Sequence, residues 1–302
     1  MADVTVILNP TAGRGAGQRL SPQISTCLAG QGLDFELLSS EGPGHASLLA
    51  SQAVEQGVPV VVAAGGDGTV NEVLHGLVKA LDGPEGTALG VLPIGTGNDF
   101  AYAAGLPLTL PEACQVIAGG QTRTIDVGRA QADNEEARYF GNGVGIGFDA
   151  IVNIESRKLQ QLRGFAVYLV AAFRTLVFYY HAPLVELSVD GQEIVRPSMM
   201  LSIMNGRRFG GGFLMTPEAE MDDGLFDVCL VGQVPRPAMV GFVPRFMRGT
   251  HVTDARVTLS RGRRVRVVSE SPWAAHVDGE IYGLGASRYE VEILPQRLRL
   301  LC

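Results

Sequence analysis

The chain has 302 residues, of which 46% are apolar and 18% are charged, and it contains 39 glycines. A chain of this length and composition forms a hydrophobic core easily, so we expect a globular, loop-rich protein of two domains and exclude a disordered one. The net charge of −7 is uneven: residues 1–127 hold 4 basic and 12 acidic side chains, and this acidic half argues against a nucleic acid as partner.

Short apolar runs alternate with amphipathic segments over the first 127 residues. The first run, in MADVTVILNP, is strand-like and lacks the basic start and the cleavage site of a secretory signal, so we expect a cytoplasmic protein. The alternation predicts a parallel, doubly wound α/β domain. Its strands are expected at Val4–Leu8, Asp34–Leu38, Val58–Ala63, Ala88–Leu92 and Thr122–Val127, and its helices at Ser21–Ala29 (with Ser21 as N-cap and Pro22 as first helical residue), His45–Gln56, Val70–Lys79 and Pro111–Ala118.

From about Gly128 the apolar residues recur with a period of two, and turn residues separate the runs. Asp190-Gly191 and Asp278-Gly279 are two-residue hairpin signals, which indicate a second, mainly antiparallel domain. The apolar stretch Leu162–Tyr180 interrupts this pattern. Arginines break it into pieces too short for a membrane span, so we expect a core helix, with a helix at a membrane interface as the alternative.

Three glycine-rich turns follow expected strands of the first domain: NPTAGRGAG at 9–17, GGDGT at 65–69 and PIGTGNDF at 93–100. In a parallel sheet such turns meet at the edge where ligands bind. Their glycines let backbone amides approach an anion, and the helices that follow add partial positive charge, so we expect a phosphate site. Neither of the two lysines of the chain lies in these turns, which excludes a P-loop.

Asp67 and Asp99 lie in two of these turns, where helices are expected to begin. Each is a candidate N-cap, which stabilises a helix by about 1 kcal/mol. Each would also face the phosphate and repel it. A divalent cation removes this conflict, because Mg²⁺ binds carboxylates, water and phosphate oxygens and supplies the positive charge of the missing lysine. We therefore expect a Mg²⁺-dependent site.

Two further patterns carry less information. GNGVGIG at 141–147 alternates its glycines and lacks the spacing G-x-G-x-x-G, so close packing explains it better than a dinucleotide does. An NAD-dependent oxidoreductase therefore lacks its fingerprint. The four cysteines are scattered and have no histidine beside them, so neither a disulfide framework nor a zinc site is expected.

The three turns, together with FGGGFLMTPEAEMDDGLFDV at 209–228 and HVDGEIYG at 276–283, resemble the diacylglycerol kinase catalytic family. These are soluble bacterial lipid kinases related to sphingosine kinases. GGDGT alone is shared with NAD kinases, whereas GTGND and the FGGG and DDG motifs point to lipid kinases. The resemblance covers nearly the whole chain. It implies an α/β nucleotide-binding domain at 1–127, a larger β-sandwich lipid-substrate domain at 128–295, and a final segment, 296–302, that returns to the first domain.

The resemblance also implies roles for particular residues. Asp67, Asp99 and Asp126 would hold a catalytic Mg²⁺ through water, and Glu280 would be the general base. Asp223, with backbone carbonyls near Glu220 and Leu225, would form a structural Mg²⁺ site. The ATP site would contain Asn9, Pro10, Thr11, Ala12, Gly13, Ser40 (where the family usually has threonine), Gly65, Gly66, Asp67, Gly68, Thr69, Val70, Asn71 and Thr96.

The implied reaction is ATP- and Mg²⁺-dependent phosphorylation of a lipid hydroxyl, with diacylglycerol to phosphatidic acid as the first expectation. A sphingoid base, a monoacylglycerol or phosphatidylglycerol stays open as acceptor, because acyl chains are bound by non-specific apolar surface. The alternative of another class is a nucleotide-binding module without turnover, against which the retained acidic residues argue. Relatives suggest a homodimer.

Two basic stretches, Val243–His251 and Arg261–Val267, would attract anionic lipid. We therefore expect the enzyme to work peripherally at a membrane surface, with a solvated basic face as the alternative.

Overall fold

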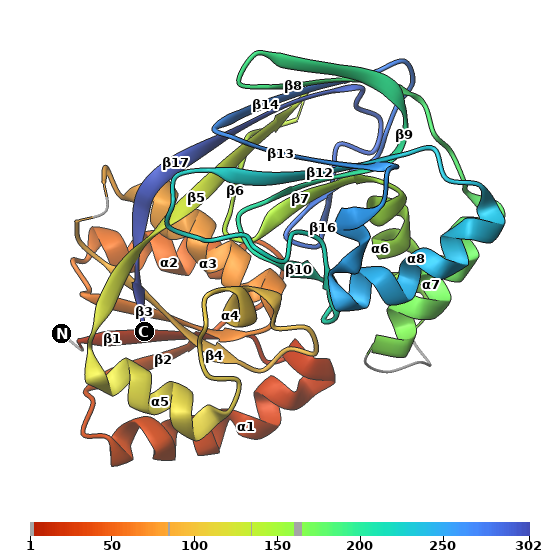
Figure 1. The fold of residues 1–302 in the computed structure, drawn as a ribbon. Coiled ribbons are helices and arrows are strands. Elements are labelled where there is room, and N and C mark those ends of the chain that lie inside the picture. Colours follow the sequence, from red (N-terminus) through yellow and green to blue (C-terminus); the bar gives the residue numbers. More distant parts are fainter. Residues whose placement is uncertain (1–2, 84, 134, 160–164) are drawn as a thin grey trace. The chain divides into compact units, whose positions relative to one another are not determined.

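The computed structural model describes residues 3–83, 85–133, 135–159 and 165–302 (Figure 1). The chain forms two units, one of Met1–Val127 with Pro295–Cys302 and one of Gly128–Leu294, called here the N-terminal and C-terminal units. Strands β5 (Thr122–Ala132) and β17 (Arg288–Leu301) pair with each other, and each contains residues of both units. The strand expected at Thr122–Val127 therefore continues to Ala132.

A parallel sheet forms the centre of the N-terminal unit. Its order is β17-β4-β3-β1-β2, in which Leu300 of β17 pairs with Leu89. The other strands are β1 (Val4–Leu8), β2 (Phe35–Ser39), β3 (Val60–Gly65) and β4 (Ala88–Pro93). β1, β3 and β4 are buried along almost their whole length. Strands buried on both faces are apolar at every position, which explains the continuous runs in the sequence.

Helices cover both faces of this sheet. α2 (His45–Glu55) packs with α3 (Asp67–Ala80) on one face, and α1 (Ala12–Gly30) packs with α5 (Leu110–Gly119) on the other (Figure 1). The short helix α4 (Asp99–Ala103) follows β4. This arrangement is the doubly wound fold, so the predicted fold class of the first domain is confirmed.

The expected start of the first helix is wrong. α1 begins at Ala12 instead of Ser21, and Pro22 lies inside it. Residues 13–15 have left-handed backbone conformations and form a kink after the first residue. Gly17, Ile24 and Leu28 are buried and hold the rest of the helix, whereas Pro22 lies on the exposed side. There, water can solvate the carbonyl group that the missing N–H of Pro22 leaves unbonded.

The C-terminal unit is an antiparallel β-sandwich. One layer has the order β16-β15-β7-β9-β12-β13 and the other β9-β8-β14-β17-β5-β6. β9 serves both layers, because residues 192–197 pair with β8 and residues 198–204 pair with β7 and β12. The strands are β6 (Arg138–Phe140), β7 (Gly143–Gly147), β8 (Leu184–Val189), β9 (Gln192–Met204), β12 (Phe226–Gly232), β13 (Val257–Gly262), β14 (Arg264–Ser269), β15 (Ala275–Val277) and β16 (Glu280–Tyr282), with a small hairpin of β10 (Arg208–Phe209) and β11 (Phe213–Leu214).

The core of the sandwich lies between these layers. Ile146 and Leu201 of one layer meet Phe140, Leu187 and Val265 of the other in a single buried cluster. Inward and outward residues alternate along β8 and β14, where every second residue is buried. This alternation is the period-two signal of the sequence, and the predicted β-sandwich is confirmed.

Three helices pack together within the C-terminal unit: α6 (Phe148–Lys158), α7 (Phe165–Phe178) and α8 (Arg236–Arg248), which the short helix η1 (Thr250–Thr253) follows (Figure 1). α7 corresponds to the helix expected at Leu162–Tyr180, whose residues 162–164 lie outside the described residues. Among the described residues, no helix has the length and apolar character of a membrane span.

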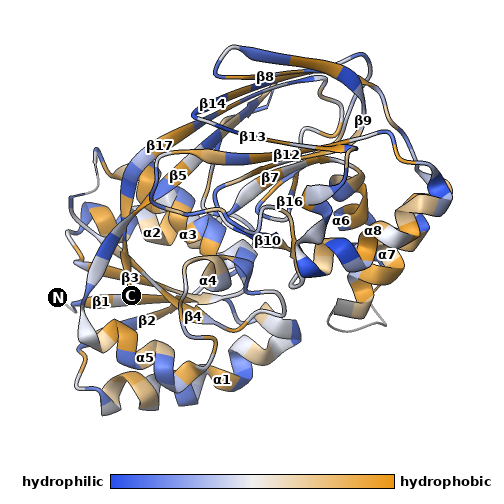
Figure 2. Cartoon of the chain, viewed as in Figure 1, coloured by the Kyte–Doolittle hydropathy of each residue, from blue (hydrophilic) through white to orange (hydrophobic). Residues whose placement is uncertain are grey.

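α7 is not the core helix that the sequence predicts. Its residues Ala171 and Leu176 are buried, but Phe173 and Phe178 are 63% and 70% exposed. Figure 2 shows apolar residues along much of the helix. It packs against α6 and α8, and its Leu176 also joins a buried cluster with Met199 and Met200 of β9. These contacts leave an apolar side of α7 exposed.

Candidate active site

The three glycine-rich turns of the N-terminal unit are joined by hydrogen bonds. Asn9, which follows β1, accepts hydrogen bonds through Oδ1 from the backbone N–H and the hydroxyl group of Thr11, at 3.0 and 2.8 Å. Its Nδ2 donates to Oγ1 of Thr69 at 3.0 Å. A single asparagine therefore fixes the NPTAG turn and joins it to the GGDGT turn.

Glycines are required where the turns approach one another. A Cβ atom on Gly65 would lie 2.3 Å from Thr69 Oγ1, and one on Gly95 would lie 2.5 Å from the Cα atom of Gly66. One on Gly13, where φ is +56°, would lie 2.5 Å from the carbonyl oxygen of Ile94. No side chain fits at such distances. The glycines thus allow all three turns to pack closely at the carboxyl edge of the sheet.

Asp67 and Asp99 do not occupy the N-cap positions that the sequence suggests, because Gly66 and Asn98 stand there. Asp67 Oδ1 instead accepts the N–H of Phe100 at 3.1 Å, which links α3 to the next turn. The two aspartates also approach each other around Gly97. A Cβ atom on Gly97 would lie 3.0 Å from Asp67 Oδ2 and 3.5 Å from Asp99 Oδ2. Two carboxylate oxygens therefore converge on one point.

The environment of Asp67 suits a cation. Burial raises the pKa of Asp67 above its usual value, and hydrogen bonds from the backbone N–H groups of Phe100, Asp99 and Asn98 oppose this shift. A nearby positive charge would stabilise the ionised carboxylate further. Carboxylate oxygens are the donors that Mg²⁺ prefers, and one from each aspartate lies within 3.5 Å of the same point beside Gly97. The residues present therefore fit this metal.

Three further predicted residues of the N-terminal unit lie on different elements. Ser40 is buried after β2 and donates its backbone N–H to Leu8 O at 2.8 Å, whereas Thr96 is exposed in the third turn. Asp126 is fully buried on β5, and its Oδ1 accepts the N–H of Gln296 at 2.7 Å. Gln296 has a left-handed φ of 48°. Asp126 thus has a structural role at this irregular point of β17 whether or not a metal binds.

Glu280 begins β16 in the C-terminal unit, directly after a tight turn. Asp278 and Gly279 have φ values of 46° and 83°, and Asp190 and Gly191 have 48° and 86°, as type I′ turns require. Both hairpin signals in the sequence are therefore confirmed.

Arg157 of α6 holds the turn that carries Glu280. Its Nη2 donates to Gly279 O at 2.8 Å and to Glu280 Oε2 at 3.0 Å. The other oxygen, Oε1, has no partner among the described residues, and the Glu280 side chain is 46% exposed. The predicted base is thus oriented through one oxygen, and its second oxygen is accessible to solvent or substrate.

Buried polar groups hold the same turn from its other side. Asp278 accepts the N–H groups of Gly141, Asn142 and Gly143 at 2.9, 3.0 and 2.7 Å. His276 Nδ1 accepts the N–H of Gly279 at 3.2 Å, and its Nε2 lies 3.1 Å from Oδ2 of Asp149. This network ties the Glu280 turn to β7 and α6.

The glycines of GNGVGIG make room for that network. A Cβ atom on Gly145 would lie 2.3 Å from Asp149 Oδ2 and 2.4 Å from His276 Nε2. On Gly147, where φ is +86°, it would lie 2.3 Å from the indole nitrogen of Trp273. Close packing therefore explains this motif, as its spacing indicates.

Asp223 already has partners for both carboxylate oxygens. Oδ1 accepts the N–H of Leu225 at 3.0 Å, and Oδ2 contacts Nη2 of Arg261. Glu220 is exposed on the same turn. A metal held by Asp223 would have to displace the guanidinium group of Arg261, which the sequence did not reveal as a partner. The structural Mg²⁺ site expected here stays a prediction.

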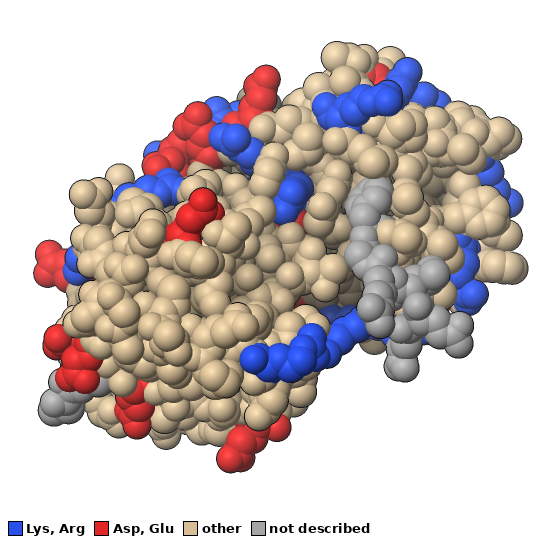
Figure 3. Space-filling model, turned by 90° about the horizontal axis from the view of Figure 1, so that it is seen from below, with Lys and Arg blue, Asp and Glu red and all other residues tan. Residues whose placement is uncertain are grey.

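The two basic stretches differ in how far their charges are neutralised. Along β14, Arg264 and Arg266 lie opposite Glu292 and Glu290 of β17. Each of these arginines therefore has an acidic neighbour on the next strand. α8, which contains Arg245 and Arg248 of the other stretch, has no acidic residue. Along the right-hand edge of the face drawn in Figure 3, the visible charged side chains are Lys and Arg. α8 is therefore the more positive of the two regions.

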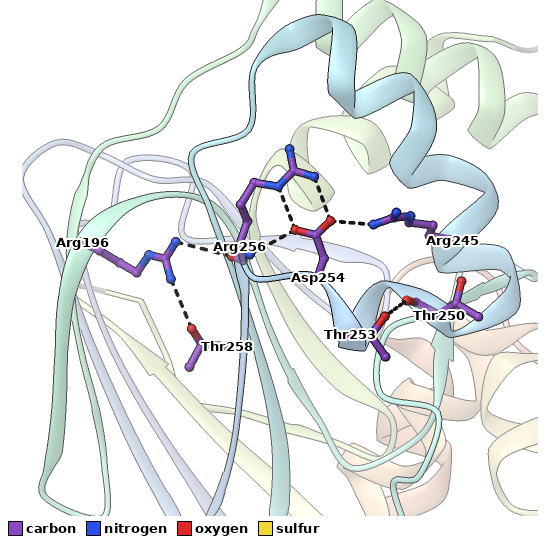
Figure 4. Close-up of polar contacts among 7 residues, drawn as sticks. All are labelled: Arg196, Arg245, Thr250, Thr253, Asp254, Arg256 and Thr258. Carbon is purple, nitrogen blue, oxygen red and sulfur yellow. Dashed lines mark hydrogen bonds and ion pairs between the residues drawn. The ribbon is translucent and has the colours of Figure 1, made fainter.

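Asp254 neutralises part of the charge of α8. It accepts hydrogen bonds from Nε and Nη2 of Arg256, both at 2.8 Å, and from Nη1 of Arg245 at 2.5 Å (Figure 4). The contact with Arg256 is the main reason why the pKa of Asp254 lies well below its usual value. The cluster fastens the end of α8 to the segment that leads into β13.

Sequence reasoning missed Arg157, Asp149 and His276. Asp149 and Arg157 are eight residues apart, two turns of one helix face, and this spacing is visible in the sequence. Their partners on the hairpin are separated from them by 127 and 123 residues. Only the fold brings these groups together.

Comparisons with known proteins agree with this architecture. Residues 3–130 match the model of the diacylglycerol kinase catalytic domain, and residues 142–302 match that of the YegS C-terminal NAD kinase beta sandwich-like domain. A diacylglycerol kinase of Mycobacterium tuberculosis is 34% identical over 267 residues, which cover 87% of this chain and 84% of that protein. A diacylglycerol kinase of Bacillus subtilis is 28% identical and covers 94% and 91%.

Solved structures show the same fold. A putative diacylglycerol kinase from Bacillus anthracis superimposes with a TM-score of 0.80 at 25% identity, over 99% of this chain and 96% of that one. Yeast NADH kinase, with a TM-score of 0.52 and 11% identity, shares the fold alone.

Together these matches identify the protein as a lipid kinase. The chain belongs to the diacylglycerol kinase catalytic family, as its motifs predict. Membership of this family implies that ATP is the phosphoryl donor and that a lipid is the acceptor.

Proposed function

We propose that this enzyme transfers the γ-phosphoryl group of ATP, with Mg²⁺, to the primary hydroxyl group of diacylglycerol and so makes phosphatidic acid. The observation that carries the proposal is the convergence of Asp67 Oδ2 and Asp99 Oδ2 beside Gly97, on turns that pack against each other. Family membership supports the lipid acceptor, and the names of the relatives support diacylglycerol.

In this proposal the glycine-rich turns bind the nucleotide. Asn9–Gly13, Ser40, Gly65–Asn71 and Thr96 line the ATP site, and Asp67, Asp99 and Asp126 hold the metal through water. Bound Mg²⁺ would neutralise the charge that develops on the transferred phosphoryl group. Asn9 and the glycines keep the turns in register, so that the aspartates need not move when the nucleotide binds.

Glu280 acts as the general base. A lipid hydroxyl group has a very high pKa, so its attack on phosphorus needs a group that takes the proton as the new bond forms. Arg157 holds Oε2 of Glu280 and leaves Oε1 without a partner among the described residues, so Oε1 is the atom we assign to this proton. Arg157 therefore orients the base.

The enzyme works at a membrane surface, because its acceptor resides there. The exposed apolar side chains of α7 and the arginines of α8 support this part of the proposal. Each basic residue near an anionic surface contributes about 1 kcal/mol of attraction. Activity should therefore rise when anionic lipid is added to neutral vesicles and fall again at high salt.

A panel of acceptors tests the choice of lipid. Diacylglycerol, monoacylglycerol, a sphingoid base and phosphatidylglycerol are each incubated in vesicles with γ-labelled ATP, and the labelled products are separated. We expect the highest kcat/KM with diacylglycerol, by at least about tenfold. A higher value with any of the other three would replace diacylglycerol as acceptor while leaving the lipid kinase class intact.

A further inference from the structure

The hairpin that carries Glu280 has little backbone support. β15 and β16 each have three residues, and β16 is the outermost strand of its layer, so among the described strands it pairs with β15 alone. A short two-stranded hairpin is at most marginally stable in water without further contacts. Groups outside the hairpin must therefore hold the turn from which Glu280 extends.

α6 holds this turn at Gly279 from two sides. Arg157 Nη2 donates to the carbonyl oxygen of Gly279 at 2.8 Å. The N–H of Gly279 donates to His276 Nδ1 at 3.2 Å, and His276 Nε2 lies 3.1 Å from Asp149 Oδ2. Because Nδ1 accepts a hydrogen bond, the neutral imidazole carries its proton on Nε2 and donates it to Asp149. Two residues of α6 thus fix Gly279, Arg157 directly and Asp149 through His276.

The surrounding chain leaves room for the pair of Asp149 and His276. The two residues are only 9% and 2% exposed. A Cβ atom on Gly145 would lie 2.3 Å from Asp149 Oδ2 and 2.4 Å from His276 Nε2, so glycine is required there. The ring of Phe209 packs edge to face with the imidazole, with their centroids 4.8 Å apart. The motifs GNGVGIG and FGGG, to which the proposed function gives no role, therefore both contribute to the surroundings of His276.

A role in stability alone does not explain this pair. Removing a carboxylate from water is costly, and well-packed apolar side chains of similar volume often stabilise a core equally well or better. Apolar side chains could not, however, present a hydrogen-bond acceptor to the N–H of Gly279. His276 does so in a fixed direction, because Asp149 holds its other nitrogen.

We propose that Asp149 and His276 are positioning residues for the general base. Asp149 keeps the imidazole proton on Nε2, so Nδ1 stays an acceptor and fixes the turn through the N–H of Gly279. The inference rests on the proposed role of Glu280 and adds two groups that act on phosphoryl transfer through it. Misplacing a reacting group by about 1 Å can lower turnover about 10²-fold, so the loss of this contact should be measurable.

Two substitutions separate the two contacts of His276. His276→Asn places Oδ1 where Nδ1 stands and keeps an acceptor for Gly279, whereas His276→Gln reaches Asp149 and leaves the Gly279 N–H without its acceptor. His276→Gln should lower kcat with diacylglycerol by about 10- to 100-fold with little change in the KM for ATP. His276→Asn should restore kcat to within about threefold of the parent. Ser188→Gln, at the matching position of the other type I′ turn, is the control and should turn over like the parent.

A double variant tests whether the pair acts through Glu280. In Glu280→Gln the base is absent, so adding His276→Gln should lower kcat by less than about threefold more, because groups that act as a unit have non-additive effects. A purely structural role would multiply the two losses. Multiplied losses, or parent-like kcat of folded His276→Gln, would overturn the inference. Asp149→Leu removes the partner of Nε2 and takes the place of His276→Gln in these comparisons if that variant fails to fold.

Hydrogen exchange tests the contact itself without ATP or lipid. In protein labelled with ¹⁵N-glycine, the amide proton of Gly279 should exchange at least about tenfold faster in His276→Gln than in the parent or in His276→Asn, because its hydrogen bond is lost. Equal exchange in all three proteins would overturn the inference. Parent-like turnover of Glu280→Gln would instead reject Glu280 as the base, and the exchange rates would be unaffected by that result.

Discussion

At the scale of single residues, Asp67 combines an unfavourable environment with a central position. Burial raises its pKa, because the ionised carboxylate is less stable inside the folded protein than in the unfolded chain, where water solvates it. Asp67→Asn removes this charge and keeps an oxygen for the N–H of Phe100. We expect phosphoryl transfer to fall by about 10³-fold, the effect of losing one strong electrostatic group.

The stability of the same variant should change in the opposite direction. In the absence of metal, Asp67→Asn should raise Tm by about 2–4 °C, which corresponds to about 1 kcal/mol in a chain of this size. Calorimetry in the presence of a chelator measures this shift. A variant that loses both activity and stability would show that Asp67 maintains the fold, and the metal role would then lose its support.

Glu280 shares its turn geometry with Gln192, which allows a matched comparison. Asp278-Gly279 and Asp190-Gly191 are both type I′ turns, and the residue that follows is glutamate in one and glutamine in the other. Glu280→Gln should lower kcat by about 10²- to 10⁴-fold with little change in the affinity for ATP. Gln192→Glu should have no effect. Turnover of Glu280→Gln within threefold of the parent would mean that another group is the base.

At the scale of elements, Asp254 fastens the C-terminal end of α8. Its contacts with Arg256 and Arg245 lower its pKa, so the carboxylate stabilises the fold when it is ionised (Figure 4). This contribution is complete above the ordinary value of 3.8 and is lost as the pH falls through the lowered pKa. Asp254→Asn should therefore lower Tm by about 2–4 °C at pH 7 and progressively less below pH 3.8. A Tm difference that stays constant between pH 7 and pH 2 would contradict this assignment.

Two groups compete for the carboxylate of Asp223: the guanidinium group of Arg261 and the expected metal ion. If Mg²⁺ binds there, added Mg²⁺ should raise the Tm of the parent and should raise that of Asp223→Ala less. The comparison is made with ATP absent and with Asp67→Asn as background, so that the nucleotide site does not contribute. An equal shift in both proteins would leave Arg261 as the only partner of Asp223.

The elements themselves were largely predictable, and the exceptions have physical causes. Buried parallel strands such as β3 are continuous apolar runs, and the type I′ turns have their Asp-Gly signature. The start of α1 could not be predicted, because Ser21-Pro22 is a good helix start by local rules and only the burial of Gly17 against the NPTAG turn carries the helix past it. The exposure of α7 depended on which helices pack against it, which periodicity does not reveal.

At the scale of the whole molecule, the sequence located the glycine-rich turns better than the surroundings of Glu280. Asn9, Asp67 and Asp99 lie in glycine-rich motifs, so local spacing was enough to select them. Arg157, Asp149 and His276 act through contacts between α6 and a hairpin more than a hundred residues away. Such partners become visible only when the tertiary structure places the helix against the hairpin.

The central claim is that bound Mg²⁺, held by the aspartates of the glycine-rich turns, supplies the charge that a lysine provides in P-loop enzymes. The direct measurement is transfer of label from γ-labelled ATP to diacylglycerol vesicles, with Mg²⁺ and with excess chelator. We predict labelled phosphatidic acid only when Mg²⁺ is present, with activity restored when the metal is added back. Full transfer in excess chelator would contradict the account.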